Sequence, residues 1–362
     1  MSKKLPKDEL KDVGYVEEER ERSGSFLFID ESPIVEYVRK KGVEITSLRK
    51  ALKEYPWLKK ISWSLICPET DKYTRISRDA DGLFLRVEKG RKVTEPIQAC
   101  YYMSGKMPVQ TVHNVVVVED DAELHLITGC TVARGLSYGL HIGVSEYIVG
   151  KNAKLTFTMI HSWIGQNVQP RAAIKLSDNS TFMSNYIVVR PSLLLNASPK
   201  VYLEGINSRA ELVNLLVGRG KSKLDVGGEL YFKAPEAKGN IVSRVVAKDE
   251  AKVIARSYLR GEAPDTRGHV ECIGLLLDDT ASIRSIPELD AKTTGSTLTH
   301  EAAIGKLAEE EIIYLMSRGL SRDEAVTILV RGFMNIEKYL EQLPETVLKY
   351  VKGIIKQVSS GL

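Results

Sequence analysis

The chain has 362 residues, 43% hydrophobic and 27% charged, which is the composition of an ordinary globular protein. Its 51 basic and 47 acidic residues nearly cancel, and no basic segment is interleaved with aromatic residues, so we expect no nucleic-acid partner. No apolar run approaches the roughly 18 residues of a membrane span, and the charged N-terminus lacks the apolar stretch of a secretory signal. We therefore expect a cytoplasmic protein that does not associate with a membrane.

Residues 1–71 are predicted to form an N-terminal helical region. The first 25 are a charged lead, which we expect to be a solvated or partly ordered helix. A helix is predicted to begin at Pro33, with Ser32 as its N-cap. A second short helix is predicted over residues 45–54. The apolar face of the helix at Pro33 consists of Ile34, Tyr37 and Val38.

Residues 72–290 have the pattern of strands. Alternating and β-branched runs dominate, such as Asn114–Val118 and Lys154–Met159, and almost no helical pattern interrupts them. The unit of strand, polar turn, small residue and strand recurs at spacings of 31, 27, 30, 41 and 30 residues. The small residues are Ala122, Ala153, Ser180, Ala210, Ala251 and Ala281.

Such a unit cannot bury its apolar face alone, so copies must stack. The repeat therefore favours a parallel β-helix over a β-sandwich, whose strands would be evenly spaced with clearer hairpin turns. An irregular all-β domain with similar turns is the remaining alternative, because turn chemistry has a small repertoire.

Residues 291–362 are predicted to form a C-terminal helical domain. One helix is predicted over Leu307–Arg318, with Gly319 as its C′ residue. The sequence Ser321–Glu324 is a capping box that opens the next helix, and a further amphipathic helix is predicted after Pro344.

Four cysteines are scattered through the chain without a CxxC pair, which is not the pattern of a disulfide framework or a four-cysteine zinc site. Cys67 and Cys100 have no partner by spacing, and we interpret both as structural. Glycines on either side of Cys130 suggest a turn or bulge where its thiol is accessible, and Arg134 would favour the thiolate. A structural Cys130 is the simpler alternative.

Cys272 is followed by His300 and Glu301 twenty-eight and twenty-nine residues later. A thiolate, an imidazole and a carboxylate can together hold a soft or borderline metal. Each also has an ordinary explanation. A lone cysteine in an apolar strand is usually a small buried hydrophobe. The His-Glu pair fits the start of a helix with Thr299 as its N-cap.

Two further patterns are interpreted as not being ligand-binding sites. His141 and His161 fit strand histidines with satisfied hydrogen bonds better than ligands. The segment 217–222 is not a phosphate loop, because Leu215 occupies a position that must be glycine, so we expect this chain to bind no nucleotide.

Several motifs between about Cys100 and Phe333 together resemble the SufB/SufD family, which scaffolds iron–sulfur cluster assembly. No single motif would be specific, but the combination is. The motifs are Gly129–Thr131, Gly139–Glu146, Ala153–Trp163, Gly268–Leu289, Thr299–Lys306, Tyr314–Gly319 and Val330–Phe333.

The resemblance implies a right-handed parallel β-helix between helical segments, in agreement with the repeat. It also implies that two subunits pair and that their C-terminal helices dock SufC, an ABC-type ATPase. Cys272 corresponds to the cluster-building cysteine at the subunit interface, Glu301 to a nearby acidic ligand and His300 to its neighbour. Cys130 corresponds to a cysteine that accepts sulfur, and Trp163 to a residue that lines the route from there to the interface.

The predicted function is therefore a non-catalytic scaffold. It would assemble a transient iron–sulfur cluster with sulfur from a donor and pass it to apo-proteins, driven by SufC. Thr299 stands where bacterial SufB proteins often have glutamate, and the cysteine-rich N-terminal region of several is missing, so we expect a homodimer in place of a SufB–SufD pair. The alternatives are a SufD-like structural subunit without its own cluster and a β-helix enzyme acting on a polysaccharide.

Overall fold

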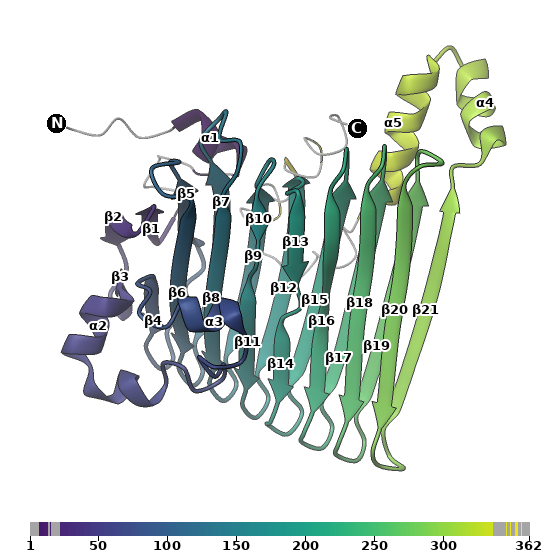
Figure 1. Cartoon of the computed structure of the whole chain (residues 1–362). Helices are drawn as coiled ribbons and strands as arrows, with labels where there is room; N and C mark the ends of the chain where they lie inside the picture. The colour runs from purple at the N-terminus through teal and green to yellow at the C-terminus, as the bar shows by residue number, and fades with distance from the viewer. Residues whose placement is uncertain are drawn as a thin grey trace.

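Two long sheets face each other in this protein, and the chain passes from one to the other at almost every turn (Figure 1). The computed structural model describes residues 7–13, 15 and 22–335, together with Glu345, Leu348, Lys352, Gly353 and Lys356. The predicted parallel β-helix core with helical segments at its ends is confirmed. None of the helices in the described part of the chain is long and apolar enough to cross a membrane.

The two sheets are named sheet A and sheet B. Within each, successive strands pair in parallel, and antiparallel pairing occurs at β1–β2 and β3–β4 near the N-terminus. Sheet A contains β1 (Gly24–Ile29), β2 (Ser32–Val38), β5 (Ile97–Met103), β7 (Glu123–Val132), β9 (Lys154–Ser162), β12 (Thr181–Arg190), β15 (Arg209–Gly218), β17 (Lys238–Ala247), β19 (Arg267–Leu276) and β21 (Thr297–Lys306). Sheet B contains β3 (Val43–Ser47), β4 (Leu83–Val87), β6 (Val109–Val118), β8 (Leu140–Val149), β10 (Asn167–Val168), β11 (Arg171–Leu176), β13 (Leu194–Ala197), β14 (Lys200–Leu203), β16 (Lys223–Phe232), β18 (Lys252–Gly261) and β20 (Ser282–Ala291).

The core lies between the sheets, because alternate side chains of every strand point inward. On β17, Ile241 and Val245 face this interior, whereas Val242 and Val246 face outward. The outward pair is also buried, because part of the C-terminal region, including Val330, covers the outer face of sheet A. Strands of sheet A therefore appear apolar on both faces.

The turns from sheet B to sheet A stack in a column that explains the sequence repeat. In the turns before β7, β9, β12, β15, β17 and β19 the residue before the small one adopts a positive φ, as Asn179 and Asn207 do, both at 55°. Asn207 Nδ2 donates a hydrogen bond to Asn179 Oδ1 (2.9 Å), and Asn152 Nδ2 donates one to Asp121 Oδ1 (2.9 Å). These side chains join turns that lie 28 and 31 residues apart in the sequence.

The predicted repeat combined two different columns of turns. Ala251 and Ala281 lie in turns that lead from sheet A to sheet B, and Ala210 lies inside β15. The counterpart of Ser180 in the next turn of the first column is Ser208. This mixture accounts for the irregular spacing of 41 residues in the predicted series.

The N-terminal region is less helical than predicted. The segment expected to form a helix from Pro33 is β2, an edge strand whose residues alternate between exposed and half-buried. An edge strand tolerates proline because its outward backbone groups need no partner. The second predicted helix is α2 (Leu48–Glu54), which begins after its N-cap Ser47 because residues 45–47 end β3.

Other short helices surround these strands. They are α1 (Lys7–Asp12), η2 (Pro56–Lys60) and α3 (Lys72–Ile76). The last falls within the segment predicted to be strand, and a capping box from Asp71 to Thr74 opens it.

The C-terminal boundary of the solenoid lies later than predicted. Strand β21 continues sheet A to Lys306, past the expected boundary at residue 290, and Thr299 lies inside this strand instead of capping a helix. The backbone pairing of β21 with β19 stabilises this segment as a strand more than an N-cap at Thr299 would stabilise it as a helix. The following helix, α4 (Glu309–Ser317), starts after Ala308, which provides no side-chain cap.

The remaining predictions for this region are confirmed where the structure describes it. Gly319 follows α4 with a φ of 95°, as expected of a C′ residue. Ser321 and Glu324 form the capping box of α5 (Arg322–Phe333). The helix predicted after Pro344 lies almost entirely outside the described residues.

We expect Asn207→Ala to lower the free energy of unfolding by about 2 kcal/mol, because alanine is strained at this φ and the bond to Asn179 is lost. Asn207→Gly removes the same hydrogen bond without the steric strain, so its loss should be smaller. Denaturant unfolding of the wild type and the two variants measures the loss due to the hydrogen bond and the loss due to backbone strain. Equal losses in the two variants would contradict the role of the positive φ.

Candidate functional site

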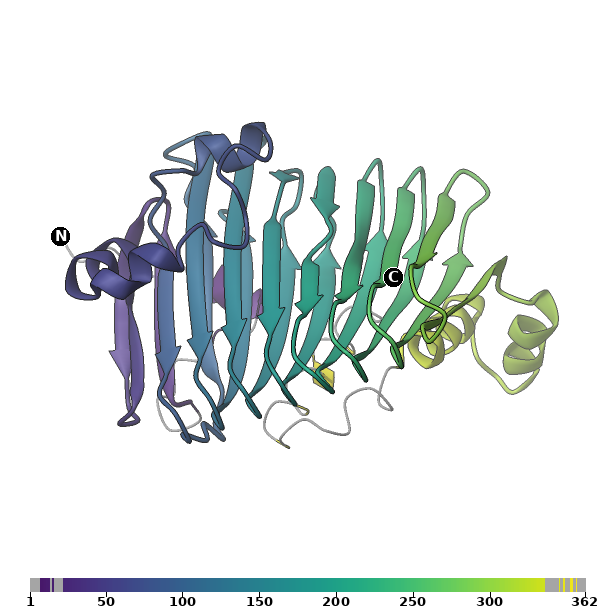
Figure 2. The same ribbon diagram turned by 90° about the horizontal axis from the view of Figure 1, so that it is seen from below.

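The C-terminal end of the solenoid has two edge strands, each of which is paired on one side only. β21 is the last strand of sheet A and β20 the last of sheet B, and neither has a further neighbour among the described residues (Figures 1 and 2). Leu289 on β20 and Ile304 on β21 are 37% and 41% exposed. Unpaired N–H and C=O groups beside exposed apolar side chains form a template on which another chain can pair.

Cys272 lies one strand in from this edge. It belongs to β19, where Ala302 of β21 is its backbone partner, and its side chain points into the interior and is 2% exposed. Burial raises the pKa of the Cys272 thiol, against opposing contributions from a hydrogen bond with Ser285 on β20 and the charge of Arg244. The thiol is therefore protonated and shielded in the isolated chain.

The structure places His300 and Glu301 on opposite faces of sheet A, because successive residues of a strand alternate. His300 lies opposite Val270 and so shares the inner face with Cys272. Glu301 lies opposite Glu271, on the outer face. One chain thus brings the thiol and the imidazole to the same face and separates the carboxylate from them.

No three His, Cys, Asp or Glu side chains in the described part of the chain converge closely enough to hold a metal ion. The predicted set of Cys272, His300 and Glu301 is accordingly incomplete as a site within one chain. That these residues bind a metal stays a prediction, and the open edge is the place where a second chain would add ligands.

Sequence reasoning missed the ion pair that supports this edge on the outer face. Arg244 on β17 lies 2.5 Å from Glu271 on β19, and both side chains are largely buried. His269 Nδ1 lies 2.8 Å from Thr299 Oγ1, which joins β19 to β21. One turn of the solenoid, here called a rung, contains about 30 residues, so side chains about 30 positions apart lie side by side on neighbouring strands. A search for complementary side chains at this separation would have revealed both contacts.

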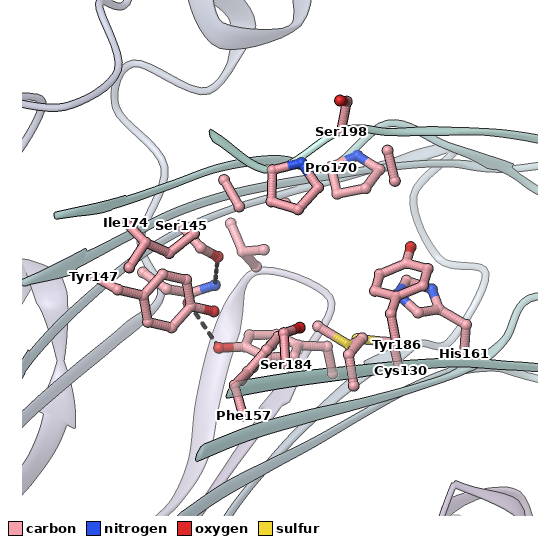
Figure 3. Close-up of a pocket in the computed structure, with 18 of the residues that line it drawn as sticks. Cys130, Ser145, Tyr147, Phe157, His161, Pro170, Ile174, Ser184, Tyr186 and Ser198 are labelled. Atoms are coloured by element: carbon pink, nitrogen blue, oxygen red, sulfur yellow. Dashed lines mark hydrogen bonds between the residues drawn. The ribbon is translucent and has the colours of Figure 1, made fainter. Parts of the chain in front are cut away.

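A second candidate site is a cavity of about 70 Å³ between the sheets, further toward the N-terminus (Figure 3). One end of it is formed by Cys130 on β7, His161 on β9 and Tyr186 on β12. Tyr147 and Ile174 of sheet B line the other end. The cavity therefore contains one of the predicted site residues, Cys130.

Of the two alternatives for Cys130, the accessible thiol at a turn is wrong, and its burial agrees with the structural cysteine. Gly129 and Cys130 lie inside a strand, and the Cys130 side chain is 2% exposed. Burial raises the pKa of this thiol well above its usual value. Arg134 lies in the loop after β7 and lines a separate cavity, so it does not offset the burial.

The two histidines of the cavity differ in their surroundings. His141 Nδ1 lies 2.9 Å from Gln110 Oε1, and its ring stacks on Trp163 at 4.5 Å between centroids. The ring of His161 lies 4.7 Å from that of Tyr186, and neither of its nitrogens has a hydrogen-bond partner. Burial lowers the pKa of both histidines to about 3, so both are neutral at ordinary pH. The prediction of a satisfied strand histidine is confirmed for His141 and wrong for His161.

Residues 101–333 match the SufBD core domain of the SUF system for FeS cluster assembly. The chain belongs to the SufBD family. A SufBD family protein of Archaeoglobus fulgidus, named for iron–sulfur cluster assembly, is 41% identical over 361 residues, which are 99% of this chain and 96% of the relative. A homolog in Methanothermobacter thermautotrophicus is 38% identical over 367 residues, 99% of this chain and 89% of its own length.

The SufB protein of Bacillus subtilis is more distant, with 28% identity over 328 residues, 88% of this chain and 70% of the relative. The matched family domain runs from β5 to the end of α5, so it contains both the cavity at Cys130 and the open edge beside Cys272. The resemblance predicted from the motifs is confirmed, and cluster assembly is the family's function.

We expect Cys67 to react with Ellman's reagent much faster than the other three cysteines in the folded protein. Cys67 is exposed, whereas Cys100, Cys130 and Cys272 are buried and their thiol pKa values are raised. Peptide mapping by mass spectrometry after brief labelling identifies the fast thiol. Cys67→Ser should remove the fast phase, and rapid labelling of Cys130 in that variant would contradict its burial.

Proposed function

We propose that this protein is a scaffold subunit of the SUF system, on which an iron–sulfur cluster is assembled at an interface between two copies and then passed to apo-proteins. The cluster is cargo, so the site must hold it and release it. The observation that carries the proposal is the position of Cys272, which shares a face with His300 one strand from an unpaired edge. Membership of the SufBD family supports the cluster chemistry.

The open edge supports a homodimer. A second copy that pairs with β20 and β21 would satisfy their outer backbone groups and cover Leu289 and Ile304. A two-fold axis would bring the two copies of Cys272 toward one another. Ligands from the second chain would complete the set that a single chain leaves incomplete.

Mixed ligation suits a transient cluster. Iron accepts thiolate, imidazole and carboxylate, whereas clusters that remain in place usually have four thiolates. Iron binding must displace the proton of Cys272, whose pKa is raised by burial. The buried thiol is thus protected until iron or a movement of the edge exposes it.

Cys130 and Trp163 are assigned to the entry of sulfur. Cys130 faces the interior between the sheets, as Cys272 does further along the solenoid, and Trp163 is buried beside His141 at the cavity. In this proposal Cys130 attacks the outer sulfur of a donor persulfide; the donor's S–S bond breaks, the donor leaves as its thiol with the Cys130 proton, and Cys130 becomes the persulfide without net oxidation or reduction. The interior then provides the route to the interface.

The C-terminal helices are assigned to docking of a SufC-type ABC ATPase in the cytoplasm. α4 follows β21 almost directly, and Glu309 on α4 forms a bidentate ion pair with Arg322 on α5 (2.5 and 2.9 Å). Movement of this helix pair would act directly on the open edge. Its exposed apolar side chains are Ile313, Tyr314, Met316 and Ile328.

A SufD-like structural subunit is the second candidate. The position of Glu301 on the outer face, away from Cys272, favours it. Membership of the SufBD family removes the support for a polysaccharide-active enzyme.

We expect anaerobic reconstitution with ferrous iron and sulfide, in the presence of the ATPase, to give a coloured cluster on the wild type that Cys272→Ala lacks. The physical reason is loss of the thiolate ligand. Iron and sulfide analysis with the visible spectrum measures it, and Cys67→Ala is the matched control that should keep the cluster. A full cluster on Cys272→Ala would sink the scaffold proposal, and no cluster on any variant would favour the SufD-like subunit.

We expect the wild type to be a dimer and the double variant Leu289→Glu with Ile304→Glu to be a monomer, because charge on the open edge opposes pairing. Sedimentation velocity measures the mass. Ile206→Glu introduces a charge at a residue that is 53% exposed in a turn and should leave the dimer intact. A dimer that survives the double variant would move the interface elsewhere.

A further inference from the structure

Sheet B is interrupted in two neighbouring rungs, at adjacent positions of the strand register. β10 and β11 are separated at Pro170, and β13 and β14 at Ser198 and Pro199. Proline has no N–H to donate to the ladder. On the adjacent strand β16, Gly227 and Gly228 lie level with Ser198 and Pro199. Together these residues form a seam across sheet B.

The seam faces the cavity directly opposite Cys130. Pro170, Ser198 and Pro199 line the cavity, and Figure 3 shows Pro170 and Ser198 on one side with Cys130 and His161 on the other. Pro170, Ser198 and Pro199 are half-buried, so the seam is a side of the cavity that borders on solvent.

Three side chains with metal-donor atoms line the far side of the cavity. Cys130 Sγ and Met159 Sδ are 3.6 Å apart. His161 is the backbone partner of Cys130 on the neighbouring strand, is 3% exposed and has no hydrogen-bond partner on either ring nitrogen. A buried imidazole without a partner is costly unless a ligand satisfies it.

The charge of the cavity restricts the ligand. Among the described residues that line it, none is Asp, Glu, Lys or Arg. A bound ion must therefore be neutralised by its own ligands. A thiolate neutralises a monovalent cation completely, whereas a divalent cation would keep one unpaired buried charge.

We propose that Cys130, Met159 and His161 form a binding site for a soft monovalent metal ion of the Cu(I) class, which enters through the seam. Thiolate, thioether and imidazole are the donors that such ions prefer. Two sulfurs 3.6 Å apart can both lie about 2.3 Å from one ion, the usual metal–thiolate length. Binding forms a metal–sulfur bond at Cys130 and releases its proton to water, with no change of oxidation state.

The site stands independently of the proposed function, because it requires no cluster chemistry. Where Cys130 also accepts sulfur, the metal ion and the sulfur occupy the same thiol and exclude one another. The geometry then makes soft metals competitive inhibitors of sulfur entry.

The test uses the full chain with Cys67→Ser and Cys272→Ser, which removes two competing thiols. Anaerobic titration with Cu(I) against a chromophoric chelator should show one tight site per chain, with sulfur and nitrogen ligands in the copper X-ray absorption spectrum. Adding Cys130→Ser should abolish that site. Met159→Leu and His161→Gln should each weaken Cu(I) binding by roughly tenfold or more.

Met183→Leu is the control, because Met183 is a buried methionine on β12 outside the cavity lining, and the Cu(I) affinity of this variant should be unchanged. Circular dichroism establishes that each variant is folded, and the conservative Met159→Leu decides the question if Cys130→Ser does not fold. Unchanged affinity in Met159→Leu and His161→Gln would overturn the proposal. So would Zn(II) binding at this site as tightly as Cu(I). Neither readout depends on cluster assembly.

Discussion

Backbone pairing between successive rungs is the interaction on which the rest of this structure depends. Each strand of a parallel solenoid satisfies its N–H and C=O groups with the strands before and after it, so stability accumulates along the stack and only the ends are left incomplete. At the N-terminal end the short antiparallel pairs β1–β2 and β3–β4, with α2 beside them, close the stack. At the other end, pairing stops at β20 and β21 without a comparable cap among the described residues. This asymmetry is the reason why we propose that a second chain binds at the open edge.

Strand alternation then decides which side chains such a partner meets. Cys272 and His300 share the inner face, and the 30-residue rung places Glu301 beside Glu271 on the outer one. Three residues that look like one ligand set in the sequence thus belong to two surfaces. In the proposed dimer, pairing with another chain at the rim where both faces meet would let ligands from the two surfaces approach one cluster. Under that proposal, backbone geometry links the chemistry to the assembly.

The parts of the fold that depend on hydrophobic alternation within a strand and on turn residues next to it were predictable from the sequence. Alternation in Lys154–Met159 and the small residues Ala122 and Ala153 follow from strand and turn chemistry, and the solenoid follows from them. Strand β2 at Pro33 and strand β21 beyond residue 290 were missed, because each forms by pairing with a neighbouring strand, and the local sequence pattern does not contain that strand. Pairing with β1 makes the first a strand, and pairing with β19 makes the second.

The candidate site was predictable in its residues and less so in its geometry. Motifs singled out Cys130 and Cys272, but accessibility depends on packing, and burial keeps both thiols protonated. The seam at Pro170 and Pro199 was invisible in the sequence because two prolines 29 positions apart become neighbours only once the rung length is known. That seam places half-buried residues opposite a shielded thiol. Under the roles proposed for Cys130, entry at the seam would let single ions or sulfur atoms reach this thiol while the regular part of the sheet excludes larger reagents.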